Sequence, residues 1–387
     1  MKRRTTIRQR ASVKRIRQRT KGKRLTGRKR NTASRTRAVG INTNSDARTS
    51  LRPLPDSKLL RSASEAGRID GQTIASMSEK ADKTSDLAAK MQEHFRRYIQ
   101  PHISRLKSYD ELLAMAEAYR NAYVGAHLPE LASVVLIPSE KKMAVVLCAY
   151  NEQDSLESVL NELKRLPLHE VVVVVNGSVD DTFDVARRMP NATIIHYKHP
   201  IGHDVGRAVG AKVTTADIIL FTDGDFPIQA EQLGAFLWAV ERGVDVALND
   251  ISPLLDSVDK YDGLSYCKQW LNHCFGRGDL HANSMTAIPH ALSRKALTTV
   301  GASTLAVPPK AQMLAMMKGL NVQTAHVVDV ITRNRIRETN IGADNVVAQL
   351  IIGDHLEAFH TALFEGGLPT PQPMLNRESI AKRRNGE

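Results

Sequence analysis

The sequence predicts an α/β fold in which a doubly wound, mostly parallel sheet follows a helical N-terminal part. Short, continuous apolar runs recur in the middle of the chain, as in strands that are buried on both faces. These runs are 143–149, 171–175, 193–196 and 217–222. The helical stretches between them are 154–166, 181–189 and 202–214. Strand and helix alternating at this spacing is typical of a parallel sheet with helices on both faces.

Composition and periodicity divide the chain into four parts. Residues 1–75 are predicted to be a basic, mostly disordered tail, because they hold few large apolar residues to bury. Residues 76–135 form a predicted helical preface, with apolar residues three to four positions apart, and residues 140–365 form the α/β domain. Residues 366–387, Pro-rich and then charged, are predicted to be a loose C-terminal tail.

The positive charge of the chain is concentrated at its N-terminus. Residues 1–37 hold 17 of the 54 Lys and Arg residues and no acidic residue, which leaves 37 basic and 41 acidic residues elsewhere. The tail is open to three interpretations: a solvated segment, a contact with nucleic acid, or a contact with an anionic membrane surface. A dedicated nucleic-acid-binding protein would spread positive charge over its folded face, so the mildly acidic remainder argues against that class.

Cysteine usage and hydropathy suit a cytoplasmic protein. Cys148, Cys267 and Cys274 are odd in number and form no CxxC pair, which favours reduced thiols over disulfides or a zinc site. No stretch approaches the roughly 18 apolar residues of a membrane span, so we expect no transmembrane segment. The sequence thus predicts a protein that is soluble or peripheral at the inner face of the membrane.

Polar residues follow three of the predicted strands, where ligands of parallel sheets bind. These sets are Tyr150-Asn151-Glu152, residues 176–182, and Asp223-Gly224-Asp225. Two carboxylates one residue apart at the end of a buried strand can hold Mg²⁺ or Mn²⁺ through oxygen ligands. A bound cation of this kind neutralises charge that develops on a nucleotide leaving group. An ordinary Asp-Gly turn is the alternative interpretation, which the neighbouring polar strand ends make the weaker one.

The segment after the third strand holds glycines and histidines. Gly202, Gly206 and Gly210 recur every four residues, which indicates close packing of a helix on the sheet. Arg207 between them is able to reach a phosphate group, since guanidinium binds such oxygens in pairs. The nearby histidines are interpreted as loop residues rather than as a metal site; they are His196, His199 and His203.

Three motifs together resemble glycosyltransferase family 2, whose members have the GT-A fold. They are residues 149–152, 176–182 and 223–225, and the resemblance extends from about Lys142 to Val330. It implies metal-assisted transfer of a sugar from a nucleotide-sugar donor. The nucleotide-sugar-binding residues that it implies are Ala149, Tyr150, Glu152, Asn176, Asp180, Arg207 and Asp223, and the metal ligands are Asp223 and Asp225.

Within this resemblance, Asp180 is expected close to the base edge and Arg207 near the diphosphate. Asp225 is expected to be the main metal ligand, and Asp223 to bind the ribose or the metal. Asn176 stands where the family usually has Asp, so the donor is not assigned to a UDP-sugar.

The catalytic base is not identified by the resemblance. Residues 277–288 and 289–300 are similar to the family's acceptor-side strand and the helix after it. The carboxylate of inverting members is expected near Asn283, which does not accept a proton. Asp279 and His281 are the nearby candidates for the catalytic role.

A phosphorylated acceptor explains a missing base, because a phosphate oxygen is already ionised near pH 7. Arg333, Arg335 and Arg337 follow a predicted strand at 326–331 and are candidates to bind such an acceptor, for example polyprenyl phosphate. The alternatives are arginines that decorate a loop, a retaining GT-A enzyme acting on a small phosphorylated acceptor such as a phosphoglycerate, and a nucleotidyltransferase. A nucleotidyltransferase usually has a Gly-rich basic loop after the first strand.

A C-terminal helix at 344–363 is expected to pack against the domain rather than to contact a membrane.

Overall fold

A computed structural model describes residues 56–77, 84–125, 127–255, 261–332 and 346–365. The helices and strands within these ranges belong to one compact unit. The predictions for residues 1–55 and 366–387, and those for Arg333, Arg335 and Arg337, lie outside the described residues.

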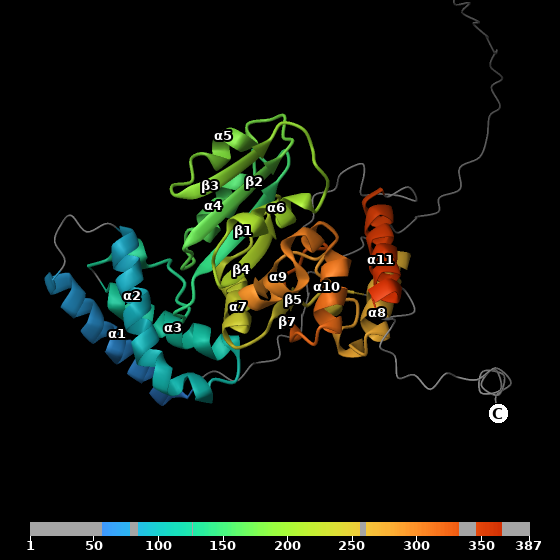
Figure 1. Cartoon of the computed structure of the whole chain (residues 1–387). Coiled ribbons are helices and arrows are strands. Elements are labelled where there is room, and N and C mark those ends of the chain that lie inside the picture. The colour runs from blue at the N-terminus through green and yellow to red at the C-terminus, as the bar shows by residue number, and fades with distance from the viewer. Residues whose placement is uncertain (1–55, 78–83, 126, 256–260, 333–345, 366–387) are drawn as a thin grey trace, which may run out of the picture. The chain divides into compact units, whose positions relative to one another are not determined.

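Within the described residues, the strands form one seven-stranded sheet in the order β3-β2-β1-β4-β6-β5-β7 (Figure 1). The strands are β1 (Met143–Ala149), β2 (Glu170–Asn176), β3 (Ala192–Tyr197), β4 (Ile218–Asp223), β5 (Val246–Asn249), β6 (His290–Ser293) and β7 (Val322–His326). Strand β6 is antiparallel to β4 and β5, whereas the other pairings are parallel. The predicted α/β class with a mostly parallel sheet is therefore confirmed.

Helices cover both faces of the sheet. They are α1 (Ser57–Met77), α2 (Thr84–Ile99), α3 (Tyr109–Val124), α4 (Leu156–Leu163), α5 (Thr182–Ala186), α6 (Val205–Val213), α7 (Ala230–Glu241), α8 (Gly263–Cys274), α9 (Arg294–Val300), α10 (Pro308–Met317) and α11 (Val346–Glu365). Side chains of β2 alternate between two buried clusters. Val173 and Val175 join the cluster of α1–α5 and α7, while Val172 and Val174 join that of α6 and α8–α11.

Helix α1 lies almost entirely inside the stretch predicted to be a disordered tail, so the helical part of the chain begins earlier than expected. Leu59, Leu60 and Ile74 pack on the core, and two glycines bring the helix close to α3. A Cβ atom at Gly67 would lie 2.2 Å from the Tyr119 carbonyl oxygen, and one at Gly71 would lie 2.1 Å from that of Tyr123. The apolar residues of this segment are few and stand among many polar ones, which is why composition suggested disorder.

Two predicted strands are placed differently. Strand β7 ends at His326, where the sequence predicted a strand to begin. Beyond it, the buried Asn249 side chain accepts a hydrogen bond from the Val328 backbone N–H at 2.8 Å and donates to its carbonyl at 2.9 Å. These bonds replace the pairing that a strand would make.

Residues 277–288 are also not a strand. They contain a 3₁₀ turn at Gly278–Leu280, and β6 begins only at His290. Buried amide side chains meet the backbone of this segment. Asn272 donates to the carbonyls of His281 and Asn283, and Gln312 accepts from the N–H of Met285.

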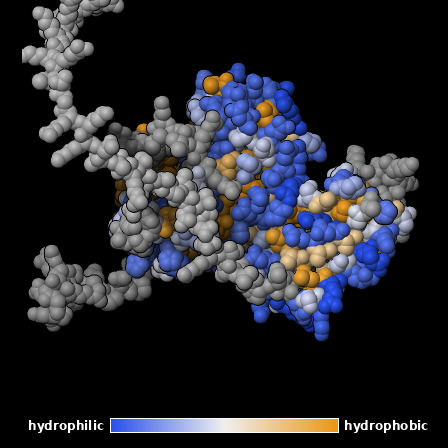
Figure 2. Space-filling model, turned by 180° about the vertical axis from the view of Figure 1, so that it is seen from behind, coloured by the Kyte–Doolittle hydropathy of each residue, from blue (hydrophilic) through white to orange (hydrophobic). Residues whose placement is uncertain are grey.

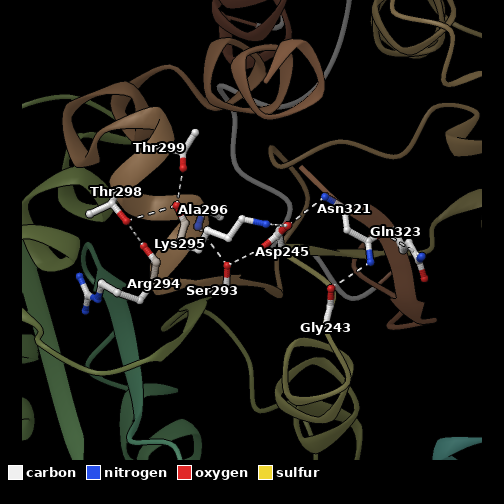
Figure 3. A network of polar contacts seen from close by, with 10 residues as sticks. All are labelled: Gly243, Asp245, Ser293, Arg294, Lys295, Ala296, Thr298, Thr299, Asn321 and Gln323. Carbon is white, nitrogen blue, oxygen red and sulfur yellow. Dashed lines mark hydrogen bonds and ion pairs between the residues drawn. The ribbon is translucent and has the colours of Figure 1, made fainter. Parts of the chain in front are cut away.

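Asp245 connects the start of β5 with β6, α9 and the turn before β7 (Figure 3). Its carboxylate accepts hydrogen bonds from the Ser293 hydroxyl at 2.9 Å, the Asn321 backbone N–H at 3.0 Å and the Lys295 ammonium at 3.0 Å. Burial by itself would raise the pKa of Asp245, but the bonds from Asn321, Lys295 and Ser293 outweigh it and lower the pKa. Lys295 is largely exposed, so its ion pair adds little.

None of the helices among the described residues is both long and apolar enough to cross a bilayer. Figure 2 shows mostly hydrophilic residues over the visible part of the face opposite to Figure 1, with hydrophobic residues in separate patches.

We predict that Asp245→Asn lowers the free energy of unfolding at neutral pH by about 1–2 kcal/mol, since an amide loses charge-assisted bonds. Because the pKa of Asp245 is lowered by folding, its stabilisation is present above the unfolded-state value of about 3.9 and is lost as pH falls through the folded-state value. Urea unfolding at several pH values measures this. The difference between the proteins should shrink below about pH 4, and Asp154→Asn, at an exposed position, should change little. A difference that persists in acid would contradict the prediction.

Candidate active site

A cavity of about 540 Å³ opens where β1, β2 and β4 end. Between β1 and β4 the strand order reverses, which is where ligands of doubly wound sheets bind. The cavity contains most of the side chains predicted to bind the donor. Those that line it are Ala149, Tyr150, Glu152, Asn176, Arg207, Asp223 and Asp225.

The acidic pair lies at the end of β4. Asp223 is level with Cys148 in the β1–β4 ladder, and the Gly224 N–H donates to the Cys148 carbonyl at 2.9 Å. The turn that carries both carboxylates is therefore fixed to β1. Asp225 also accepts a hydrogen bond from the Phe226 N–H at 3.1 Å.

The carboxylate oxygens of Asp223 and Asp225 fit a hard divalent cation that a bound ligand also coordinates. Two carboxylates supply oxygen ligands, but Mg²⁺ and Mn²⁺ take about six, so diphosphate and water would complete the shell. Consistent with that division, no group of three or more His, Cys, Asp and Glu side chains that could hold a metal occurs in the described part of the chain.

Arg207 is buried between two carboxylates. It pairs with Asp204, the residue just before α6, and with Asp223 at 3.2 Å. Burial would lower the pKa of Arg207, but Asp204 and Asp223 outweigh it and raise the pKa, so the guanidinium stays charged. The sequence placed this group at a phosphate. In the structure it lines the cavity while orienting Asp223.

Close packing of α6 on the sheet positions Arg207. A Cβ atom at Gly206 would lie 2.9 Å from the Cys148 Sγ, and one at Gly210 would lie 2.3 Å from a Val146 methyl carbon. The predicted packing role of these two glycines is confirmed. Gly202 differs, because it precedes the helix and has a φ of +123°.

Hydrogen bonds join the loop after β1 to the loop after β2. The Asn151 N–H donates to the Ser178 hydroxyl at 3.0 Å, and the Asn151 side chain accepts from the Val179 N–H at 2.9 Å. The Glu152 N–H donates to the Thr182 hydroxyl at 2.8 Å. These bonds hold Asn151 at a φ of +55°, which Asn tolerates better than most residues. Tyr150, on the same turn, lines the cavity and stays 44% exposed.

Asp180, expected near the base edge, does not line the cavity. Its carboxylate accepts hydrogen bonds from the N–H groups of Thr182 at 3.1 Å and Gln153 at 3.2 Å. Burial would raise the pKa of Asp180, yet the bonds from Thr182 and Gln153 lower it overall. It therefore organises the two loops rather than the ligand site.

Asn176 holds the loop that follows β3. Its amide nitrogen donates to the Gly202 carbonyl at 2.7 Å, and its amide oxygen accepts from the Ile201 N–H at 2.9 Å. An aspartate could make only the second bond. Gly177 allows the same loop to approach, since a Cβ atom there would lie 2.4 Å from the Pro200 nitrogen.

The candidates for a catalytic base are not brought to the cavity. Asp279 forms an ion pair with Arg277 at 2.7 Å, and His281 is exposed elsewhere. Asn283 is buried and donates to the Asp250 carboxylate at 3.1 Å. The sequence inference for Asp279 and His281 assumed that residues 277–288 form a strand, which they do not.

Sequence reasoning missed the apolar part of the cavity wall. It comes from segments far apart in the chain, namely Phe226, Ile228, Ile288, Val330, Val347 and Ile351. It also dismissed His203, which lines the cavity. The helix that supplies Val347 and Ile351 was predicted, but nothing local in its sequence indicates that it reaches the donor site.

Residues 144–261 match the family model described as Glycosyl transferase family 2. The match includes the three motifs and confirms the resemblance predicted from them. Among curated proteins, the chain is similar to a dolichyl-phosphate hexose transferase from Haloferax volcanii. The two are 37% identical over 111 residues, which cover 28% of this chain and 47% of the relative. The chain thus spans about half the length of that curated relative.

Solved structures of glucosyl-3-phosphoglycerate synthase from Mycobacterium tuberculosis are also similar. The complex with Mn²⁺, UDP and glucosyl-3-phosphoglycerate is 18% identical, covers 57% of this chain and 80% of its own, and has a TM-score of 0.43. The complex with Mg²⁺ and UDP is 17% identical, covers 59% and 82%, and has a TM-score of 0.43.

We predict that Asn176→Asp destabilises the protein by about 1 kcal/mol, because the aspartate loses the bond to Gly202 and turns a charge toward that carbonyl. Chemical unfolding measures the change. Asn161→Asp makes the same replacement at an exposed position of α4 and is the control. Equal losses of stability in the two variants would show that the loop contact is unimportant.

Proposed function

We propose that this chain transfers a sugar from a nucleotide-sugar donor to a lipid-linked phosphate acceptor of the polyprenyl phosphate type, assisted by Mg²⁺ or Mn²⁺. The single observation that carries the proposal is the cavity itself. It combines the acidic pair Asp223 and Asp225 with an apolar wall, in a segment of glycosyl transferase family 2.

On the donor side, the residues at the ends of β1 and β4 bind the nucleotide. The exposed ring of Tyr150 stacks on the base, and Glu152 lies beside it on the same turn. Asp223 and Asp225 hold the cation, which when bound neutralises charge on the departing diphosphate. Arg207 keeps the Asp223 carboxylate in place.

On the acceptor side, the wall is apolar. Val347 and Ile351 of α11 face the cavity together with Ile228, Ile288 and Val330. Apolar surface of this kind favours a ligand that carries a hydrocarbon chain. It adds no favourable free energy of binding for a small, fully polar acceptor such as a phosphoglycerate. The printed name of the Haloferax volcanii relative, a dolichyl-phosphate hexose transferase, supports the same acceptor class.

The reaction needs no base from the protein if the nucleophile is a phosphate oxygen. Such an oxygen is ionised near pH 7 and attacks the anomeric carbon directly. The bond from that carbon to the donor diphosphate breaks, and the nucleoside diphosphate leaves with the electron pair. Arg333 and Arg335, which follow Val330 in the sequence, stay predicted contacts of the acceptor phosphate and lie outside the described residues.

Nucleotidyl transfer is less well supported. That chemistry usually places a basic, Gly-rich loop after the first strand to bind a triphosphate, whereas Tyr150, Asn151 and Glu152 occupy this turn here.

We predict that Asp225→Asn lowers the metal-dependent release of nucleoside diphosphate by about two orders of magnitude or more, because the main cation ligand loses its charge. A scan of nucleotide-sugars with and without MnCl₂ measures the release. Asp184→Asn removes an exposed carboxylate of α5 away from the cavity and should leave the rate unchanged. Full metal-dependent activity in Asp225→Asn would reject the proposed role of the acidic pair.

For the acceptor, we predict that Ile351→Ser raises the KM for polyprenyl phosphate roughly tenfold, because apolar contact with the chain is lost. Hydrolysis of the donor without acceptor should not change. Ile69→Ser, at an exposed position of α1 that does not line the cavity, is the matched control. Transfer to phosphoglycerate but not to polyprenyl phosphate, in the unaltered protein, would overturn the acceptor class.

A further inference from the structure

The cavity has an imbalance of charge that the donor would increase. Three carboxylates line it, those of Glu152, Asp223 and Asp225, and a diphosphate would add at least two further negative charges. Arg207 is already engaged with Asp204 and Asp223. Of the described residues that line the cavity, His203 is the remaining side chain able to carry a positive charge.

The position of His203 is fixed on both sides. Asn176 binds the backbone of Ile201 and Gly202 through both ends of its amide. On the other side, the buried Asp204 is anchored by its ion pair with Arg207. The exposed imidazole is therefore carried by a restrained segment, directly before the helix whose Arg207 orients Asp223.

Helix α11 brings a carboxylate to the same region. Asp354 follows Val347 and Ile351 at spacings of seven and three residues, which places all three on one side of the helix. Val347 and Ile351 line the cavity together with His203. Asp354 is half-buried. No ion pair joins a described cation to it.

The electrostatics of Asp354 link it to His203. Burial first, and then the negative charges of Asp204 and Glu357, raise the pKa of Asp354 to about 6, while His203 acts in the opposite direction. Asp354 and His203 are therefore close enough to interact electrostatically.

We propose that His203, supported by Asp354 of α11, is the side chain that binds the diphosphate of the donor. The inference rests on the proposed function, because a nucleoside diphosphate is the ligand that it concerns. It assigns a role in donor binding to a residue outside the three motifs. It also makes α11 part of the donor site and not only of the acceptor wall.

Other charged groups lie around the cavity that His203 lines. They are Asp204 before α6, Arg207 of α6, Asp223 of β4, Asp225 and Glu152 of the neighbouring turns, and Asp354 and Glu357 of α11. The comparison of two proteins under the same conditions removes their common contribution to nucleotide binding.

The test compares the unaltered full chain with His203→Gln by calorimetric titration of UDP and of GDP in the presence of MnCl₂. The variant should bind the nucleotide roughly tenfold more weakly, because a hydrogen bond to the diphosphate is lost. Uridine and guanosine alone should bind both proteins equally. Asp354→Asn should weaken nucleotide binding by a smaller factor, because His203 loses its support.

His199→Gln is the matched control, since His199 is an exposed histidine of the same loop that does not line the cavity. It should bind like the unaltered protein. Equal affinity of His203→Gln and the unaltered protein would overturn the inference and leave the proposed function standing. Failure of the unaltered protein to bind either nucleotide would instead overturn the proposed function and, with it, this inference.

Discussion

The buried guanidinium of Arg207, held between Asp204 and Asp223, is the interaction on which the site depends. It joins α6 to the end of β4, and the small residues Gly206 and Gly210 bring it close enough to do so. A buried charge without a partner costs several kcal/mol, so the three groups are stable only together. The carboxylate that begins the acidic pair is therefore positioned by the packing of a helix on the sheet, before any ligand arrives.

Sequence reasoning predicted which side chains meet at the ends of β1, β2 and β4, because that part of the cavity is encoded locally. These strands are continuous apolar runs, and parallel pairing brings their carboxyl ends to one edge of the sheet. It failed where tertiary contacts replace local signals. Residues 277–288 resemble a strand, but buried amides such as Asn272 and Gln312 bind their backbone. Helix α1 was missed because its few apolar residues stand among many polar ones.

The replacement of the family's usual aspartate by Asn176 has a structural cause. Its amide both donates and accepts within one loop, which a carboxylate does not do at neutral pH. The departure from the motif therefore concerns the placement of Ile201 and Gly202 rather than the choice of base. It leaves the nucleotide of the donor open, and it explains why a residue at the end of β2 governs a segment that begins some twenty-five positions later.

Helix α11 has apolar residues on the side that lines the cavity and also among its exposed residues. Its inner side supplies Val347 and Ile351 to the cavity, while Leu356 and Phe364 are among its exposed residues. A helix that is apolar on several sides is normally buried, so exposure of this kind needs a ligand or a neighbour to explain it. A polyprenyl chain is longer than a cavity of about 540 Å³ can enclose, so most of it must lie outside. An acceptor of this class therefore requires apolar surface beyond the cavity mouth, and the exposed Leu356 and Phe364 of α11 are such surface.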